Sequence, residues 1–396
     1  MKLTVGNGSR WPYFADDEIE AVTKVLHSGK VNQWTGKEVE SFQEEFASFC
    51  EVEHAIALAN GTVALELALK VLGIGPGDEV IVTPRTFIAS ASCVVLQGAR
   101  PVFADVNYET QNITSESIRK VITPKARAIV AVHLAGWPCD MDPIMELAHE
   151  HNLKVIEDCA QAHGAKYKGR PVGSLGDVAA FSFCQDKIMT TGGEGGMLLT
   201  NDNNLWETCW AYKDHGKSIE SVYRKKHPPG FRWLHDSFGT NWRITEMQAA
   251  IGRVQLRKLQ SWVEIRRRNA SILTERLSSL DGLRITLPPP EICHSYYKYY
   301  VFVRPDRLRP GWDRDRIMNT IAECGIPCFS GSCSEIYLEK AFVNSNLDPT
   351  ERLQVARELG ETSLMFLVHP TLSEDMISAT ADVVERVLKK ATKYRS

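Results

Sequence analysis

The feature that most constrains the fold is an alternation of short apolar runs and helical patterns through the first half of the chain. Most gaps between the runs carry a helical pattern, such as the strong helix formers at 63–72. Runs that are apolar throughout are typical of parallel strands buried on both faces of a sheet. We predict strands at 55–59, 79–83, 101–105, 126–133, 154–157 and 178–183. The alternation indicates an α/β fold, in which ligands bind beyond the carboxyl ends of the parallel strands.

A long helix-rich stretch, from about 244 to 280, follows this alternation. It carries Arg266, Arg267 and Arg268, and we expect these three arginines to form a solvated face of the helix. No internal repeat or low-complexity linker interrupts the chain. The stretch therefore marks a change of architecture rather than a flexible connection.

The pattern after residue 280 is mixed. A strand is predicted at 298–304, and helices are predicted at 313–324 and 374–390. We therefore expect a second, smaller unit of α+β type. The expected domains are a large α/β domain at 1–280, which includes an N-terminal segment at 1–36, and the smaller domain at 281–396.

Composition and charge exclude several classes of function. Of the 396 residues, 43% are hydrophobic and 24% are charged, and the formal net charge is −3. The chain lacks the basic excess that binding to a nucleic acid backbone normally requires. No stretch approaches the roughly 18 apolar residues of a membrane span, and the first residues lack the apolar core of a signal peptide. We expect a cytoplasmic protein whose partners include neither nucleic acid nor membrane.

The ten cysteines are scattered along the chain, and their even number is only weak evidence for disulfides. Cys324, Cys328 and Cys333 form the only tight group. Without a paired C-x-x-C motif or a neighbouring histidine, three such thiols are typical of small packed residues rather than of metal ligands. We expect no metal site.

Two motifs at predicted strand ends could bind a charged ligand. Gly61-Thr62 opens a helix after a strand, so its free backbone N–H groups and the helix dipole could hold a phosphate. A plain helix cap is the alternative. Asp158 follows the apolar run 153–156 and lies at the ligand-facing end of the sheet. It could be a structural cap or ion pair, a metal ligand, or an acceptor that keeps a heterocyclic nitrogen protonated.

Lys187 is the candidate nucleophile. It follows the apolar run 178–183 and precedes a glycine-rich turn at 192–196. A lysine held inside a cleft has a lowered pKa, and a neutral amine can attack a carbonyl to form a Schiff base. An exposed lysine would remain protonated and unreactive. The glycines do not fit G-x-G-x-x-G and do not follow the first strand, so a nicotinamide-binding site is excluded.

Taken together, these stretches resemble the DegT/DnrJ/EryC1/StrS family of PLP-dependent sugar aminotransferases, which are fold-type I enzymes similar to aspartate aminotransferase. The stretches that carry the resemblance are 60–65, 157–164, 181–187 with 190–196, and 241–243. Further matching segments lie at 29–36, 86–91, 133–136 and 243–252. The resemblance implies a large domain with a mostly parallel central sheet flanked by helices, a smaller C-terminal α+β domain, and pyridoxal 5'-phosphate (PLP) as the cofactor.

The resemblance also assigns roles to individual residues. Lys187 matches the lysine that forms the Schiff base with the cofactor, and Asp158 matches the carboxylate that keeps the pyridine nitrogen protonated, so that the ring accepts electrons. Gln161 matches a residue near the phenolic oxygen. Phe87 matches the aromatic ring that stacks on the pyridine.

The phosphate of the cofactor would be held by two parts of the chain. Gly61, Thr62 and Ser182 match the residues of the family's phosphate cradle. Asn241 matches an asparagine that reaches the phosphate from the neighbouring subunit. The resemblance therefore implies a homodimer with shared active sites, in which a monomer is inactive.

The implied reaction moves nitrogen from an amino acid, expected to be glutamate, to a keto sugar, for lipopolysaccharide or another surface glycan. The segment 329–337 lacks the histidine and proline found there in many enzymes that act on nucleotide sugars. The acceptor is therefore either a nucleotide-linked keto-deoxysugar or an acidic keto sugar such as an 8-keto-octulosonate. Four cations could hold its diphosphate or carboxylate, or could simply be solvated: Arg85, His215, Lys217 and Arg232.

Three other functions are alternatives to this reaction. Relatives that dehydrate sugars have histidine in place of the lysine, so Lys187 argues against a dehydratase. Relatives that make an aromatic amine keep the lysine, and the stretch 157–164 also resembles theirs. A non-catalytic sensor or scaffold could share the fold, because fold alone does not determine function.

Overall fold

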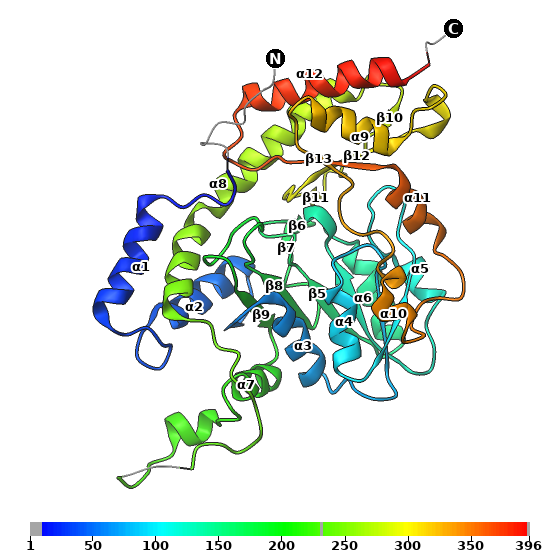
Figure 1. Ribbon diagram of the computed structural model, residues 1–396. Helices are drawn as coiled ribbons and strands as arrows, with labels where there is room; N and C mark the ends of the chain where they lie inside the picture. The colour runs from blue at the N-terminus through cyan, green and yellow to red at the C-terminus, as the bar shows by residue number, and fades with distance from the viewer. Residues whose placement is uncertain (1–9, 230–232, 394–396) are drawn as a thin grey trace.

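The computed structural model describes residues 10–229 and 233–393. Its largest element is a seven-stranded sheet in the order β1-β9-β8-β5-β4-β2-β3. Figure 1 labels β5, β8 and β9 of this sheet in the body of the molecule. The strands are β1 (His54–Leu58), β2 (Glu79–Val82), β3 (Arg100–Phe103), β4 (Ala126–Val132), β5 (Lys154–Asp158), β8 (Val178–Ser182) and β9 (Gly196–Thr200).

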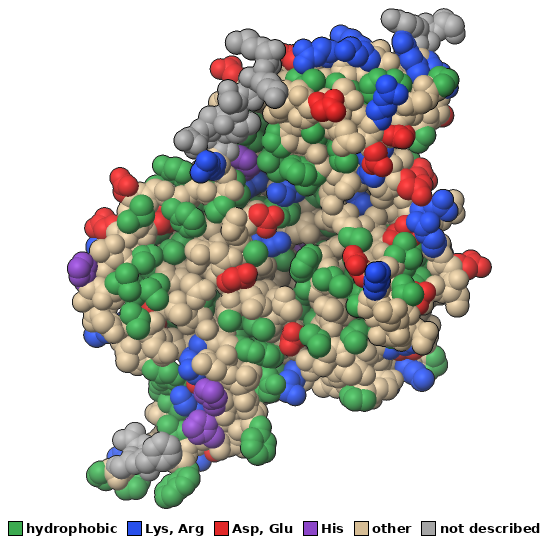
Figure 2. Space-filling view, in the orientation of Figure 1, with side chains coloured by type: hydrophobic (Ala, Val, Ile, Leu, Met, Phe, Trp, Pro, Cys, Tyr) green, Lys and Arg blue, Asp and Glu red, His purple; other side chains and the backbone are tan. Residues whose placement is uncertain are grey.

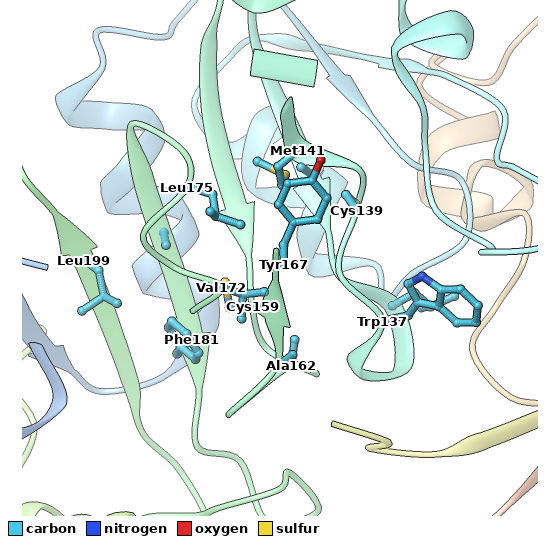
Figure 3. Packing of buried hydrophobic residues seen from close by; sticks show 14 of the residues in the cluster. Trp137, Cys139, Met141, Cys159, Ala162, Tyr167, Val172, Leu175, Phe181 and Leu199 are labelled. Atoms are coloured by element: carbon cyan, nitrogen blue, oxygen red, sulfur yellow. The ribbon is translucent and has the colours of Figure 1, made fainter. Parts of the chain in front are cut away.

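Both faces of this sheet are buried, as the apolar runs predict. On β4, Ile129 and Ala131 belong to one hydrophobic cluster, whereas Ala128 and Val130 belong to another. Because successive side chains of a strand point to opposite faces, the two clusters are the two sides of the sheet. Figure 3 shows part of the first cluster, including Phe181 of β8. The predicted fold class is confirmed.

One strand of the seven-stranded sheet, β9, was not predicted from the sequence. β9 pairs with β8 and with β1, in both cases antiparallel, whereas every other pairing in this sheet is parallel. Ser182 at the end of β8 lies opposite Gly196 at the start of β9. The segment that contains Lys187 is therefore the connection of an antiparallel hairpin, and it lies at the carboxyl end of β8.

Helices connect and cover the strands. Those before residue 280 are α1 (Asp16–Ser28), α2 (Glu38–Cys50), α3 (Gly61–Val71), α4 (Ala89–Leu96), α5 (Ser115–Arg119), α6 (Met141–Glu150), α7 (Asn203–Tyr212) and α8 (Glu246–Leu277). The start of α3 is fixed by Asn60, whose side chain accepts a hydrogen bond from the N–H of Val63 at 3.0 Å. A capping side chain of this kind satisfies one of the free N–H groups at the first turn.

The C-terminal part contains a four-stranded antiparallel sheet in the order β10-β12-β14-β13. Its strands are β10 (Leu283–Arg284), β12 (Tyr299–Val303), β13 (Cys328–Phe329) and β14 (Ser363–Phe366), and its helices are α9 (Arg314–Glu323), α10 (Lys340–Val343), α11 (Gln354–Thr362) and α12 (Glu374–Ala391). A small sheet joins it to the rest of the chain, because β11 (Ile292–Cys293) pairs with β6 (Lys166–Tyr167), which also pairs with β7 (Arg170–Pro171).

The long helix α8 belongs to two cores. Leu259 and Val263 pack in the first cluster beside the large sheet, whereas Leu273 and Leu277 pack in a third cluster with the C-terminal sheet and α12. The boundary that we predict near residue 280 would fall in the turn between α8 and β10. The division into two domains there remains a prediction.

The expectation of a solvated arginine face on α8 is wrong for Arg266. This side chain is 1% exposed, and its Nη1 donates hydrogen bonds to the carbonyls of Tyr296 and Tyr297 at 3.4 and 3.2 Å. Its guanidinium also lies 5.0 Å from the ring centre of Trp11. The segments that contain Trp11 and Tyr297 contact this face of α8, so the side chain of Arg266 is buried. Arg267 and Arg268 remain exposed.

One segment departs from the compact body. Residues 214–229 and 233–241, here called the extension, leave the end of α7 and return to Asn241, as Figure 1 shows at lower left. Asp214 and Asn241 form a bridge at its base, and Lys217 pairs with His235 further out. Three of its apolar side chains are largely exposed, namely Tyr223, Trp233 and Phe238, at 67%, 87% and 99%.

Candidate active site

A cavity of about 780 Å³ lies beyond the carboxyl ends of β1, β2, β5 and β8. This is the place where ligands bind in open parallel sheets. The structure brings together around it most of the residues predicted for cofactor binding and catalysis: Gly61, Thr62, Phe87, Asp158, Gln161, Ser182 and Lys187. The C-terminal part closes the cavity with residues near β12, β13 and β14.

One end of the cavity suits a phosphate group. Gly61 and Thr62 are the first residues of α3, where backbone N–H groups have no partner within the helix. A Cβ added to Gly61 would lie 2.6 Å from the Cβ of Ser182, so only glycine lets the helix start this close to the end of β8. The Oγ of Ser182 accepts a hydrogen bond from the N–H of Cys184 at 3.3 Å.

Asp158 is the last residue of β5 and is 5% exposed. Its Oδ2 accepts a hydrogen bond from the Oγ of Ser90 at 2.7 Å, and its Oδ1 accepts one from the N–H of Ala160 at 3.1 Å. Within the described part of the chain, no lysine, arginine or histidine forms an ion pair with it. A buried carboxylate of this kind, oriented but without a cation, suits a ligand nitrogen that carries a proton.

Lys187 is half-buried in the connection between β8 and β9. Its backbone is held on both sides, because its N–H donates to the carbonyl of Cys184 at 3.1 Å and its carbonyl accepts from the Nε1 of Trp11 at 2.8 Å. Its Nζ lies 5.3 Å from the ring centre of Tyr297. The hydroxyl of Tyr297 donates a hydrogen bond to the carboxylate of Asp186. The segment that carries this amine is thus held at the cavity by two distant parts of the chain, at Trp11 and Tyr297.

Two further predicted residues line the cavity. Phe87 is 66% exposed, so its ring has an open face available for stacking. The Oε1 of Gln161 accepts a hydrogen bond from the N–H of Ala135 at 2.9 Å, which fixes the orientation of its amide. The roles that the sequence assigns to these residues stay predictions, but their positions are compatible with them.

The residues present fit PLP. An anion site at the start of α3, an oriented carboxylate at the end of β5 and an amine after β8 match the phosphate, the ring nitrogen and the aldehyde of that cofactor. When bound, PLP supplies a ring that accepts the electron pair released as a substrate carbon loses its proton. Gly61, Asp158 and Lys187 would hold its three functional groups.

Several predicted residues do not line the cavity. Arg85 has no exposed surface, and its Nε donates to the Oε1 of Gln111 at 3.0 Å. Its guanidinium lies 5.5 Å from the ring centre of Tyr300, a residue that does line the cavity. Arg85 is therefore separated from the space it was expected to border. Arg232 lies outside the described residues.

The other predicted cations lie at the base of the extension. His215 and Asn241 are exposed there, and the Nζ of Lys217 bonds to the carboxylate of Asp214 at 3.2 Å. Hydrophobic, histidine and basic side chains gather on the extension in Figure 2. His215, Lys217 and Asn241 therefore do not line the cavity of their own chain.

The sequence did not identify Lys298, Tyr297 or Trp11 as site residues. Lys298 and Tyr297 line the cavity just before β12, and Trp11 contacts the backbone of Lys187. The sequence signal that could have identified Lys298 is its position as a lysine at the start of an otherwise apolar predicted strand. Trp11 lies 176 residues from Lys187 in the sequence, and no local pattern connects the two.

A second polar cluster lies inside the protein. One ligand atom from each of three buried residues, His133, Glu157 and Cys159, lies within 4.8 Å of the others. The Nδ1 of His133 accepts from the N–H of Cys139 at 2.9 Å, and its Nε2 lies 2.9 Å from Glu157. Burial alone would raise the pKa of Glu157, but hydrogen bonds from His133 and from backbone amides hold that pKa below its ordinary value. Its carboxylate already has these partners, and the cluster is structural.

The fold and this arrangement of amine, carboxylate and helix terminus define a class of protein, the fold-type I PLP-dependent aminotransferases. The chain belongs to the DegT/DnrJ/EryC1/StrS aminotransferase family, whose model matches residues 12–387. The family resemblance, the enzyme class and the cofactor predicted from the sequence are thereby confirmed.

Individual relatives support the same assignment. The chain is 35% identical over 366 residues to the GDP-perosamine synthase of Escherichia coli O157:H7, which covers 92% of this chain and 94% of that enzyme. It is 36% identical over 372 residues to the dTDP-3-amino-3,4,6-trideoxy-alpha-D-glucose transaminase of Streptomyces venezuelae, with 93% and 92% covered. The crystal structure of an aminotransferase from Psychrobacter cryohalolentis is 57% identical, with a TM-score of 0.95 and with 96% and 99% covered.

The helices were also compared with the requirements of a membrane span. Within residues 10–229 and 233–393, none is both long enough and apolar enough to cross a bilayer.

Proposed function

We propose that this aminotransferase moves the amino group of glutamate to the keto group of a nucleotide-linked sugar. The observation that carries the proposal is the single cavity that contains the amine of Lys187, the carboxylate of Asp158 and the start of α3. Two relatives that cover most of the chain have names that include a nucleotide-linked sugar. The product would be an amino sugar for lipopolysaccharide or another surface glycan, made in the cytoplasm.

Each residue of the cavity has a task in this reaction. Lys187 holds the cofactor between turnovers and carries a proton to and from the reacting carbon. Asp158 would accept the N–H of the pyridine ring, and Phe87 would stack on that ring. Gln161 would contact the phenolic oxygen. Gly61, Thr62 and Ser182 would hold the phosphate.

The active enzyme in this proposal is a homodimer. The extension presents Tyr223, Trp233 and Phe238 to solvent, and large exposed apolar side chains on a projecting segment are typical of an interface. At its base, buried Asp214 forms an ion pair with Arg243 at 2.6 Å. Asn241 at this base is exposed and does not line the cavity of its own chain, so it is available to a second subunit.

An acidic keto sugar, such as an 8-keto-octulosonate, is the second candidate acceptor. The specific observation in its favour is the end of β13 and the loop that follows it, where Phe329, Gly331 and Ser332 line the cavity. This loop offers no histidine to a nucleotide sugar, and Lys298 lies in the same lining. A dehydratase is disfavoured by Lys187, and a scaffold role by the complete set of catalytic groups.

The test is a panel of keto sugars incubated with glutamate and the purified enzyme. The proposal expects 2-oxoglutarate and an amino sugar in equal amounts, without loss of water. Dehydration of the sugar or formation of an aromatic amine would instead indicate the other reactions of the family. No 2-oxoglutarate with any acceptor, from protein that binds PLP, would contradict the proposal.

Dimerisation has its own test. The Lys187→Ala and Asn241→Ala variants should each be inactive alone. Mixed heterodimers should regain activity, because one of their two sites receives an intact Lys187 and an intact Asn241. Folded mixtures that recover nothing would show that the sites are not shared.

A further inference from the structure

Two amines line the active-site cavity. Lys187 follows β8 and Lys298 precedes β12, and they are the only lysines or arginines among the described lining residues. The two Nζ atoms lie 5.3 and 4.6 Å from the ring centre of Tyr297. Because both distances share this endpoint, the two nitrogens are no more than about 10 Å apart. Once Lys187 is joined to the cofactor, Lys298 is the remaining ammonium of this lining.

Lys298 has donors without a close acceptor. Its side chain is 17% exposed, and its nearest acid is Asp186, at 3.9 Å. That distance is too long for a hydrogen bond. The same Oδ2 atom of Asp186 already accepts the hydroxyl of Tyr297. An ammonium has three N–H donors, and within the described chain no hydrogen-bond acceptor reaches those of Lys298.

The surrounding charge favours an anion. Arg266 is buried behind Tyr297 and donates to its carbonyl at 3.2 Å. Lys187 and Lys298 thus lie near the ring of Tyr297 and Arg266 lies at its backbone carbonyl, with Asp186 as the acid beside the two lysines. Burial, together with Arg266 and Lys187, lowers the pKa of Lys298 to about 8, whereas Asp186 opposes that change. A carboxylate that enters here would meet a positive potential in a partly desolvated space.

We propose that Lys298 binds a substrate carboxylate close to the reacting carbon. The inference rests on the proposed function and names the chemistry that the site recognises beyond the keto group. Two sources supply such a carboxylate, namely the amino acid donor and an acidic keto sugar. An ion pair with hydrogen bonds is the strong form of this contact.

The two half-reactions separate the two sources. Donor alone converts the bound cofactor from its aldehyde form to its amine form, and acceptor alone reverses the change, so each can be followed by absorbance. Lys298→Met should raise the half-saturating concentration of the carboxylate-bearing substrate about tenfold or more, the loss expected for one charge-assisted hydrogen bond. Lys298→Arg should retain most of the affinity. Lys166→Met, a half-buried lysine of β6 outside the cavity, is the matched control.

Each outcome decides the inference. A change confined to the donor half-reaction identifies the amino acid as the source, and a change confined to an acidic acceptor identifies the sugar. Equal half-saturation in Lys298→Met and wild type for both would overturn the proposal. If wild type converts the cofactor with amino acids but aminates no sugar, the proposed function fails while the donor measurement still tests Lys298.

A second measurement avoids substitution altogether. Amine-reactive labelling of the wild-type holoenzyme, read by peptide mass spectrometry, should modify Lys298. Succinate should slow that modification, whereas its neutral diamide should not. Labelling at Lys298 that succinate leaves unchanged would contradict carboxylate binding even if the Lys298→Met variant failed to fold.

Discussion

The cavity has two walls of different construction. On the sheet side, Asp158 and Ser182 are the last residues of parallel strands, and Gly61 begins a helix. Backbone hydrogen bonds of the strands and the helix fix the positions of these three residues. On the C-terminal side, Lys298 precedes a strand and Ser332 lies in a loop. The N–H of Ser332 donates a hydrogen bond to the hydroxyl of Tyr300 at 2.9 Å.

This difference separates two kinds of requirement. Cofactor chemistry needs groups held to within a fraction of an ångström, and strand ends provide that precision. Recognition of a particular substrate needs variation, which loops and side-chain contacts allow without disturbing the sheet. We therefore expect changes in the sheet wall to affect every substrate equally, and changes in the C-terminal wall to affect only substrates that carry the matching group.

The largest effect is expected for Lys187→Ala. Loss of the amine removes both the covalent attachment of the cofactor and the proton carrier, so kcat should fall by at least about 10³-fold for every acceptor. Borohydride should fix the cofactor to wild type at Lys187 and not to the variant. Lys125→Ala, an exposed control, should be unaffected. If the variant kept activity with some acceptors, the expectation that changes in the sheet wall affect every substrate equally would be wrong.

Asp158→Asn should follow, with roughly a 10²-fold loss of kcat in both half-reactions. The amide keeps the shape but not the charge that stabilises a protonated ring nitrogen. The control is Asp177→Asn, whose carboxylate bonds to Lys154 and to the N–H of Val155, each at 2.8 Å, near the opposite end of β8. That variant should lose stability but keep its kcat. If both variants lost kcat equally, the loss in Asp158→Asn could not be assigned to a contact with the cofactor.

The sheet wall was largely predictable from the sequence. Asp158 and Lys187 follow apolar runs, and the position of a residue after such a run already places it at the ligand-binding edge. The glycine at position 61 and the helix formers after it fixed the start of α3 in the same way. β9 was not predicted, because its apolar run is short and directly follows the glycine-rich turn. Its antiparallel direction depends on pairing with β8 and β1, which the local sequence does not specify.

The C-terminal wall could not be predicted in the same way. Lys298 becomes a cavity residue only because β12 packs beside the connection between β8 and β9. Arg266 was expected in solvent, since three consecutive arginines on a helix usually are, yet Trp11 and Tyr297 cover it. Arg85 is buried for a similar reason. These errors all concern contacts between distant segments, about which local patterns carry no information.

Gly61→Ala should have a smaller effect on the same wall. The added Cβ would lie 2.6 Å from the Cβ of Ser182 and 3.0 Å from its Cα, so the helix must move away from the strand. Such overpacking costs about 1–3 kcal/mol and should weaken PLP binding roughly tenfold. Titration of the apoenzyme with PLP measures this directly.

Gly75→Ala is the matched control for that substitution, because its Cβ would meet nothing closer than the carbonyl oxygen of Gln97, at 3.9 Å. It should leave the affinity for PLP unchanged. An equal loss in both variants would mean that general destabilisation, and not the approach of α3 to β8, controls cofactor binding.

The smallest expected effect is a pH dependence of the C-terminal wall. The pKa of Lys298 is lowered to about 8, first by burial and then by Arg266 and Lys187. Lys298 is therefore cationic below pH 8 and neutral above it. Inhibition by succinate, which does not titrate in this range, should be level below about pH 7 and weaken by about threefold between pH 7.5 and 8.5.

The groups that face Lys298 do not produce the same profile. Burial lowers the pKa of Arg266 to about 9, so this guanidinium keeps most of its charge up to about pH 8.5. The pKa of His369 is lowered to about 3, mainly by burial, so this ring is neutral throughout. In Lys298→Arg the cation persists through this interval, and the inhibition constant of succinate should stay level between pH 7.5 and 8.5. If that variant keeps the wild-type profile, the titrating group lies elsewhere, and the C-terminal wall does not recognise substrate through Lys298.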